Sequence, residues 1–407
     1  MPQKRAAPCN TGLALAGGGP LGAIYETGAL LALDEALEGI DFNDIDAYVG
    51  VSSGSFIAAA LANGIDIATI YRTFIESEGT DHPLTPNVFL KPALHEYLSR
   101  GVTVPRLLLE ALWRYLTSPR DRGLMESLAG LARACPTGLF DNAAISRHLS
   151  ELFAEHGGTD DFRHLGHRLY LVATDLDTGV AVNFGEPGND RVPISRAVQA
   201  SAALPGLFPP VEIGGRYYVD GALTKTLHAS IALDAGAKLV ICVNPIVPFN
   251  AELAATQGRP RHAKLVEGGL PVVMSQTFRA LIHSRMTVGL SKYDTQYPDA
   301  NVVLFEPSRD DSEMFFTNPF SYAGRRRVCD HAYQRTRADL LARHSKLEPV
   351  FARHGIRIRL DVLRDPHRHA SARVGARHAG APRYRVPATR GLAGALDRLD
   401  KILEAEP

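Results

Sequence analysis

The chain has 407 residues, of which 45% are apolar, so it is long enough to bury the core of a full α/β enzyme. Lysine plus arginine and aspartate plus glutamate number 44 each, which excludes the strong overall field by which basic proteins attract nucleic acid or anionic membranes. The four cysteines, at positions 9, 135, 242 and 329, have no zinc-site spacing and indicate buried or free thiols in a reducing compartment.

The first predicted elements are a short apolar strand over 13–16 and a helical pattern that runs to Leu37 and is stopped by Gly39. Three successive glycines connect them: Gly17, Gly18 and Gly19. Glycines that enter a helix expose backbone N–H groups at the positive end of its dipole, which favours a bound anion. In a serine hydrolase that anion is the tetrahedral oxyanion.

The same segment, ending at Gly22, also matches Gly-x-Gly-x-x-Gly, a pattern typical of dinucleotide sites. Such a site needs an acidic residue about 20 positions on, at the end of the second strand. Here the next strand ends in Val51 and Ser52, and the acids at 41, 44 and 46 precede it. No Gly-Lys-Ser/Thr follows the glycines either, so we expect no nucleotide and no other cofactor.

A Gly-x-Ser-x-Gly pattern follows, with Ser52 between Gly50 and Gly54. It lies between an apolar strand over 47–51 and an alanine-rich run over 56–62. A serine on the tight turn from strand to helix is typical of a nucleophile elbow, in which a side chain at either glycine would crowd the turn. The pattern therefore predicts Ser52 as a nucleophile.

The segment from the elbow helix to the next strand, at 168–174, is too long for a single crossover. We interpret residues 75–140 as a helical insertion that caps the site. Within it, a helix over 103–119 has a narrow polar stripe and contains the only tryptophan, Trp113. A helix with so little polar surface is buried on several sides or touches lipid, and its short length favours burial against the core.

A second candidate for chemistry is Asp220, which follows the β-rich run over 217–219 and precedes Gly221 and Ala222. Strand ends are where an α/β sheet presents its catalytic groups. Alone, an Asp-Gly pair is an ordinary turn. Together with the two glycine motifs upstream, it predicts a catalytic carboxylate.

The order Gly-Gly-Gly-x-x-Gly, Gly-x-Ser-x-Gly and Asp-Gly-Ala resembles that of the patatin-like phospholipase family, and the segment 200–210 is also similar to the one that precedes the aspartate there. The resemblance spans roughly residues 12–245. It implies a calcium-independent lipid acyl hydrolase with a Ser-Asp dyad, without cofactor or metal, acting on a phospholipid or another acyl lipid. By this resemblance Ser52 is the nucleophile and Asp220 its base, and the remaining roles fall to glycines: Gly17, Gly18 and Gly19 as the oxyanion hole, with Gly22, Gly50, Gly54 and Gly221 supporting the motifs.

One departure leaves alternatives open. After the Asp-Gly pair many family members carry Asn and then Pro, where this chain has Thr226 and His228. A general esterase with a Ser52-His228-Asp220 triad is therefore an alternative, although His228 is also placed to begin a helix over 229–235. A catalytically inactive protein that binds a lipid or a partner is the other alternative.

Strand-like runs alternate with helical patterns, which predicts a three-layer α/β/α patatin-like fold with a mostly parallel central sheet. The runs lie at 13–16, 47–51, 168–174, 217–219, 238–243 and 301–305. We expect an acyl hydrolase domain over 1–350, with 246–350 as an extension in which the apolar cluster 314–320 lines an acyl pocket, packs in the core or forms a lid hinge. Residues 351–407 are expected to form a basic linker, richest in arginine at 364–390, and a C-terminal helix.

The N-terminus has neither a signal peptide nor a membrane span, and no later stretch approaches ~18 uninterrupted apolar residues. We therefore expect a cytoplasmic protein that makes at most peripheral contact with a membrane and has no nucleic-acid partner.

Overall fold

A computed structural model describes residues 10–76, 92–93, 106, 136–224, 227–256, 264–317, 324–371 and 374 of the chain. The cap insertion predicted over 75–140 falls almost entirely outside these residues, and so does its Trp113 helix except for Arg106. The C-terminal helix predicted over 391–404 lies outside them as well.

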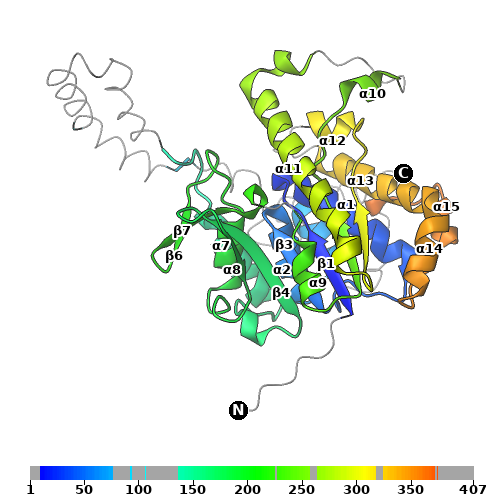
Figure 1. The fold of residues 1–407 in the computed structure, drawn as a ribbon, viewed down its shortest axis with the longest axis horizontal. Helices are drawn as coiled ribbons and strands as arrows, with labels where there is room; N and C mark the ends of the chain where they lie inside the picture. The colour runs from blue at the N-terminus through cyan, green and yellow to red at the C-terminus, as the bar shows by residue number, and fades with distance from the viewer. Residues whose placement is uncertain are drawn as a thin grey trace, which may run out of the picture.

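Five parallel strands form one side of the central sheet and extend to its edge (Figure 1). In spatial order they are β4 (Arg168–Asp175), β3 (Ala47–Val51), β1 (Thr11–Leu15), β8 (Leu239–Val243) and β9 (Asn301–Phe305). β1, β3 and β8 read as continuous apolar runs because helices cover both faces of the sheet. The predicted α/β fold with a mostly parallel sheet is confirmed.

Three further strands make the sheet mixed. β5 (Ala181–Phe184) and β7 (Arg216–Asp220) pair antiparallel with β4, and β6 (Val211–Ile213) pairs antiparallel with β7. All six predicted strands are present within two residues at their ends, whereas β5 and β6 were not predicted.

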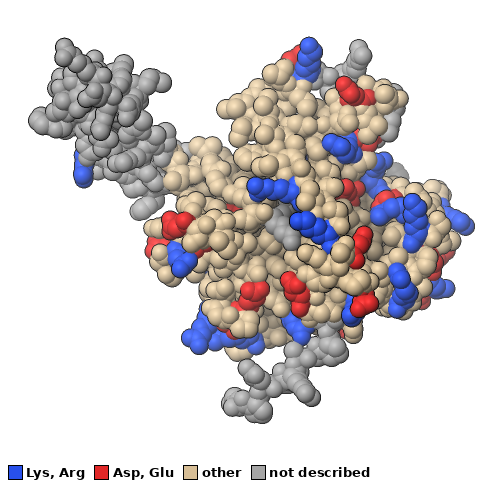
Figure 2. Space-filling view, in the orientation of Figure 1, with Lys and Arg blue, Asp and Glu red and all other residues tan. Residues whose placement is uncertain are grey.

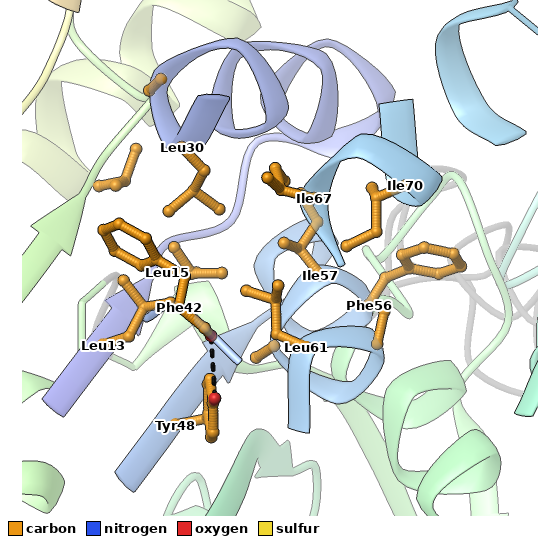
Figure 3. Packing of buried hydrophobic residues seen from close by; sticks show 14 of the residues in the cluster. Leu13, Leu15, Leu30, Phe42, Tyr48, Phe56, Ile57, Leu61, Ile67 and Ile70 are labelled. Carbon is orange, nitrogen blue, oxygen red and sulfur yellow. Dashed lines mark hydrogen bonds between the residues drawn. The ribbon is translucent and has the colours of Figure 1, made fainter. Parts of the chain in front are cut away.

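The side chains of β1 show how the three layers are built. Leu13 and Leu15 point into the core formed with α1 (Gly19–Ala36), α2 (Ser53–Ala62), α7 (Ala143–Glu155), α8 (Ile194–Ser201) and α13 (Arg325–Ala342). Ala14 points to the opposite face, which is covered by α9 (Ala229–Asp234) and α11 (Gly269–Gln296). In Figure 3, Leu13 and Leu15 lie against side chains of α1 and α2, including Leu30 and Leu61.

The remaining short elements connect these layers. They are β2 (Leu37–Glu38), α3 (Ile67–Tyr71), η1 (Arg72–Glu76), η3 (Phe162–His164), η4 (Gly221–Leu223), α10 (Ala251–Thr256), η5 (Leu265–Gly268), α12 (Ser312–Phe316), α14 (His344–Ala352), β10 (Arg357–Ile358) and α15 (Leu360–Arg364). Among the described helices none is long and apolar enough to cross a membrane.

α13 covers α1 closely. A Cβ atom on Gly28 of α1 would lie 2.2 Å from the carbonyl oxygen of Cys329 in α13, so only glycine allows this approach. Cys329 and Cys242, the two cysteines in the described part of the chain, are buried and free, as predicted.

Residues after 350 continue to pack on this core. β10 pairs antiparallel with β2, and Arg337 of α13 donates to the carbonyl oxygens of Val362 and Asp365 at 2.7 and 2.6 Å. Arg368, from the segment predicted as a basic linker, pairs with Glu35 of α1. The division into parts 1–350 and 351–407 stays a prediction.

Candidate functional site

Ser52 occupies the turn from β3 into α2. Its φ of 51° makes it the only non-glycine residue with positive φ in the described part of the chain. Side chains rarely adopt this backbone conformation, and where it occurs the surrounding structure has to enforce it. Ser52 is only 6% exposed.

The two glycines that flank Ser52 allow this turn to form. A Cβ atom on Gly50 would lie 2.5 Å from the Cα of Ser55. A Cβ atom on Gly54 would lie 2.6 Å from the carbonyl oxygens of Leu15 and Ala16. Both distances are shorter than any van der Waals contact, so the start of α2 fits against the end of β1 only with glycine at both positions.

β4 aligns the two candidate catalytic residues. β3 pairs with β4 as far as Val51, opposite Val172, and β7 pairs with the next residue of β4, Ala173, through Asp220. Because β5 pairs with residues 171–174 of β4 on the other edge, β3 and β7 share one edge and meet end to end there. Ser52 and Asp220 therefore come together although they are far apart in the sequence.

The side chain of Ser52 reaches the carboxylate of Asp220 and lowers its pKa, as a hydroxyl directed at a carboxylate does. Asp220 is 3% exposed, and its Oδ1 also accepts from the backbone N–H of Ala222 at 2.8 Å. Burial raises the pKa of Asp220 to about 6, and the hydrogen bonds from Ser52 and Ala222 act in the opposite direction. The group is therefore a buried carboxylate that is largely ionised at neutral pH.

Ser201 and Ala203 hold both backbones in place. The backbone N–H of Ser52 donates to Oγ of Ser201 at 2.8 Å, and this Oγ in turn donates to the carbonyl of Val172 at 2.5 Å. The N–H of Asp220 donates to the carbonyl of Ala203 at 3.0 Å. Both residues lie in the segment 200–210, for which no role was predicted from the sequence. A buried serine among small residues has no motif that would have revealed it.

The glycine loop between β1 and α1 passes beside Ser52. A Cβ atom on Gly17 would lie 2.9 Å from the Cβ of Ser52. Gly18 is the N-cap of α1 and lies against Gly22 and Pro245.

Gly19, the first residue of α1, has open space where a Cβ would be. No acceptor among the described residues is bonded to the backbone N–H groups of Gly17 or Gly18. Gly221, after Asp220, passes so close to Val172 that a Cβ would lie 2.3 Å from its carbonyl oxygen. The structure thus gathers the glycine loop, the elbow and the Asp-Gly turn into one site.

His228 is buried at the N-cap of α9, which matches the helix start predicted for it. The hydrogen bonds that act on the pKa of Asp220 come from Ser52 and Ala222, and no histidine of the described chain is among the groups that shift it. Within the same residues, no three side chains of His, Cys, Asp or Glu gather in a way that would hold a metal ion.

The apolar cluster predicted over 314–320 is described as far as residue 317. Met314 is buried in the main core, whereas Phe315 stacks on Phe249 with ring centroids 5.2 Å apart. Met314 and Phe315 line a small pocket with the loop after β8 and with Arg279 of α11. The cluster therefore packs in the core and also lines a pocket.

Two solved structures resemble the chain over much of its length. VipD from Legionella pneumophila is 16% identical, with a TM-score of 0.38, and the match covers 83% of this chain and 68% of VipD. The type III effector protein ExoU is 17% identical, with a TM-score of 0.33, and the match covers 83% of this chain and 53% of ExoU.

Curated relatives match somewhat more than half of the chain. An uncharacterized NTE family protein of Mycobacterium tuberculosis (strain CDC 1551 / Oshkosh) is 28% identical over 241 residues, which are 59% of this chain and 31% of that protein. The probable lipid hydrolase 463L of Invertebrate iridescent virus 6 is 26% identical over 227 residues, which are 53% of this chain and 61% of that protein. The chain thus spans less than a third of the mycobacterial relative.

A protein-family model also matches the part of the chain that contains the candidate site. Residues 13–233 match the sequence profile described as patatin-like phospholipase. This range includes the glycine loop, the elbow, the segment 200–210 and Asp220.

Proposed function

Because the chain belongs to the patatin-like phospholipase family, we propose that it is a serine hydrolase that cleaves carboxylic esters of acyl lipids, in the manner of a phospholipase A or lysophospholipase. The observation that carries the proposal is the position of Ser52, on a strained turn, beside the buried carboxylate of Asp220, whose pKa it lowers. The name of the viral relative, a probable lipid hydrolase, agrees with this substrate class.

In the proposed mechanism, Oγ of Ser52 attacks the ester carbonyl while Asp220 takes the serine proton. Backbone N–H groups of Gly17, Gly18 and Gly19 stabilise the negative charge on the tetrahedral intermediate. The intermediate collapses to an acyl-serine, and the alcohol or lysolipid leaves with the proton held by Asp220. Water then attacks the acyl-serine with Asp220 as base, which releases the fatty acid and restores Ser52.

The burial of Asp220 suits this role. An exposed aspartate is a weak base, whereas a pKa of about 6 raises the proton affinity and still leaves the group ionised at neutral pH. In the proposal the hydroxyl of Ser52, which lowers the pKa of Asp220, gives its proton to this carboxylate. No imidazole is required for this step.

A fluorophosphonate probe tests the nucleophile, because it labels only activated serines. We expect S52A to abolish labelling and the release of free fatty acid from phosphatidylcholine and lysophosphatidylcholine vesicles, measured by mass spectrometry. S53A is the matched control, because Oγ of Ser53 is buried without a hydrogen-bond partner among the described residues. Full labelling of the S52A variant would overturn the assignment, and wild-type protein that neither labels nor releases fatty acid would indicate a binding protein.

A further inference from the structure

The first half of α11 exposes a continuous apolar face. Five large apolar side chains share it at helical spacing, with 39% to 73% of each exposed: Leu270, Val273, Met274, Phe278 and Leu281. Val288 continues the same face one to two turns further along, and it is 55% exposed. Figure 1 shows this half of the helix extending beyond the central sheet.

The opposite face of the same half-helix is polar and contacts the protein. The side-chain amide of Gln276 accepts from the N–H of Phe249 at 3.1 Å and donates to its carbonyl at 2.8 Å. Arg279 donates to the carbonyl of Val247 at 3.3 Å, and its guanidinium lies 5.3 Å from the centre of the Phe315 ring. The loop after β8 thus fixes the rotation of α11 about its axis.

This orientation reverses the polarity of an ordinary surface helix, which turns its apolar stripe inward. The hydrogen bonds of Gln276 and Arg279 keep the apolar side chains directed outward. A contiguous exposed apolar patch of this kind marks a surface that is covered by another apolar phase or molecule.

α11 also adjoins the candidate active site. Arg285 donates to the carbonyl of Leu223 at 3.0 Å, in the η4 turn that follows Asp220. Met286 packs in the same cluster as Ala222, whose N–H donates to the carboxylate of Asp220. Leu281, the last residue of the outward apolar face in this half of α11, therefore lies one helical turn before Arg285, which contacts the segment after Asp220.

The charges along α11 indicate what covers this face. Within α11 the only acidic residue is Asp294, in the last turn, and Glu267 precedes the helix, whereas Arg285 and Lys292 are basic and exposed. Figure 2 shows a largely uncharged surface along the upper half of α11, with charged side chains at its upper end and lysine or arginine side chains lower on the same side of the molecule. An apolar face bordered by basic side chains fits the boundary between acyl chains and anionic headgroups.

We propose that the first half of α11 binds a lipid surface and places that surface beside Ser52 and Asp220. This proposal rests on the proposed function, because it assigns the element through which the hydrolase meets aggregated substrate. α11 is not among helices able to cross a membrane, so it lies in the plane of the interface. The Trp113 helix, to which the sequence pointed for burial or lipid contact, lies outside the described residues.

Flotation with vesicles tests the proposal, using the S52A protein so that the lipid is not consumed. We expect it to bind vesicles of phosphatidylcholine mixed with phosphatidylglycerol, and F278S/L281S in the same background to bind at least about tenfold less. V180S is the matched control, because Val180 is 60% exposed in the turn after β4 and far along the chain from α11. It should bind as the parent does.

Activity provides a second measurement with Ser52 intact. F278S/L281S should hydrolyse a short soluble ester at the parental rate, with an unchanged melting temperature, and hydrolyse vesicle lipid at least about tenfold more slowly. Equal binding of both variants to vesicles overturns the proposal while leaving the proposed function in place. A parent that is a dimer by light scattering, and becomes a monomer in F278S/L281S without any vesicle binding, also overturns it and identifies a second copy as the occupant.

Discussion

Oγ of Ser201 accepts a hydrogen bond from the backbone N–H of Ser52 and donates one to the carbonyl of Val172. One buried hydroxyl thus connects the elbow turn to β4, the strand that also aligns Asp220. The strained φ of Ser52 is enforced from outside the Gly-x-Ser-x-Gly motif as well as within it.

We expect S201A to reduce kcat by about 10- to 100-fold with little change in KM, because a shift of the nucleophile affects the reacting geometry more than substrate binding. The free energy of unfolding should fall by about 1–3 kcal/mol, since the N–H of Ser52 loses its acceptor. S195A is the control: Ser195 lies in the same helix, is also buried, and donates to Asp160 at 2.7 Å. A loss of kcat in S195A equal to that in S201A would show a general effect of destabilised α8.

The rate should depend on the ionisation of Asp220. Since its pKa is about 6, we expect kcat/KM for a soluble ester to fall as the pH decreases below about 6 and to reach a plateau above it. D220N should lower the plateau by about 10²- to 10⁴-fold and remove this dependence. The pH profile of kcat/KM is measured from about pH 5 to about pH 8. If the fall in rate at acid pH persists unchanged in D220N, a group other than Asp220 causes it.

The same pKa predicts a change in stability with pH. Folding raises the pKa of Asp220 from 3.8 to about 6, so the folded state holds the proton more tightly than the unfolded chain. This contribution to stability is fully present below the lower value and is lost as the pH rises through the higher one. The loss amounts to about 3 kcal/mol. Urea unfolding of the parent and D220N at several pH values should show that their difference in stability changes by this amount.

His228 distinguishes a dyad from a triad. H228N keeps a residue that favours the N-cap of α9, so the helix should retain its start. We expect its kcat to stay within about threefold of the parent, while D220N loses about 10²- to 10⁴-fold. Losses of similar, near-complete size in both variants would favour the triad.

Glu26 of α1 is fully buried, and neither of its carboxyl oxygens has a partner among the described residues. Burial raises its pKa well above the ordinary value, so the folded state favours the protonated form and stability falls as the pH rises. E26M should therefore raise the free energy of unfolding by about 1–3 kcal/mol, and by more at alkaline than at acid pH.

Glu35, on the same helix, is a buried glutamate whose carboxylate does have partners. Tyr333 and Arg368 both contact its carboxylate. E35M should therefore destabilise the protein, and urea unfolding of the two variants at one pH compares them directly. Stabilisation by E35M and not by E26M would contradict the assignment of Glu26 as the unpaired group.

The sequence predicted the strands that lie between two layers of helices, because burial on both faces produces a continuous apolar run. β1, β3 and β8 were found in this way, whereas β9, a partly buried strand at the edge of the sheet, was found from its apolar sequence. β5 and β6 were missed since they are short and border the sheet, where one partly exposed face removes the apolar signal. The antiparallel direction of β7 was also not predicted, because whether a strand pairs parallel or antiparallel depends on strands that are distant in the sequence.

The residues of the site likewise divide into those that could be predicted from the sequence and those that could not. Ser52, Asp220 and the glycines carry local turn patterns, so their positions are readable from short stretches of chain. Ser201 acts on Ser52 across a long separation in sequence, and nothing near it in the chain indicates this. The apolar residues of α11 repeat at helical spacing, but a periodic pattern does not say which face of a helix turns inward; the contacts of Gln276 do.

The close cover of α1 by α13 has a consequence for biosynthesis. A ribosome delivers Gly28 long before Cys329, the residue against which it packs. At typical elongation rates the interval is roughly 15–60 s. During this time the helix that carries the glycine loop has an uncovered apolar side, on which a chaperone or a premature contact with another nascent chain can act. α1 is thus fully covered only after most of the polypeptide has left the ribosome.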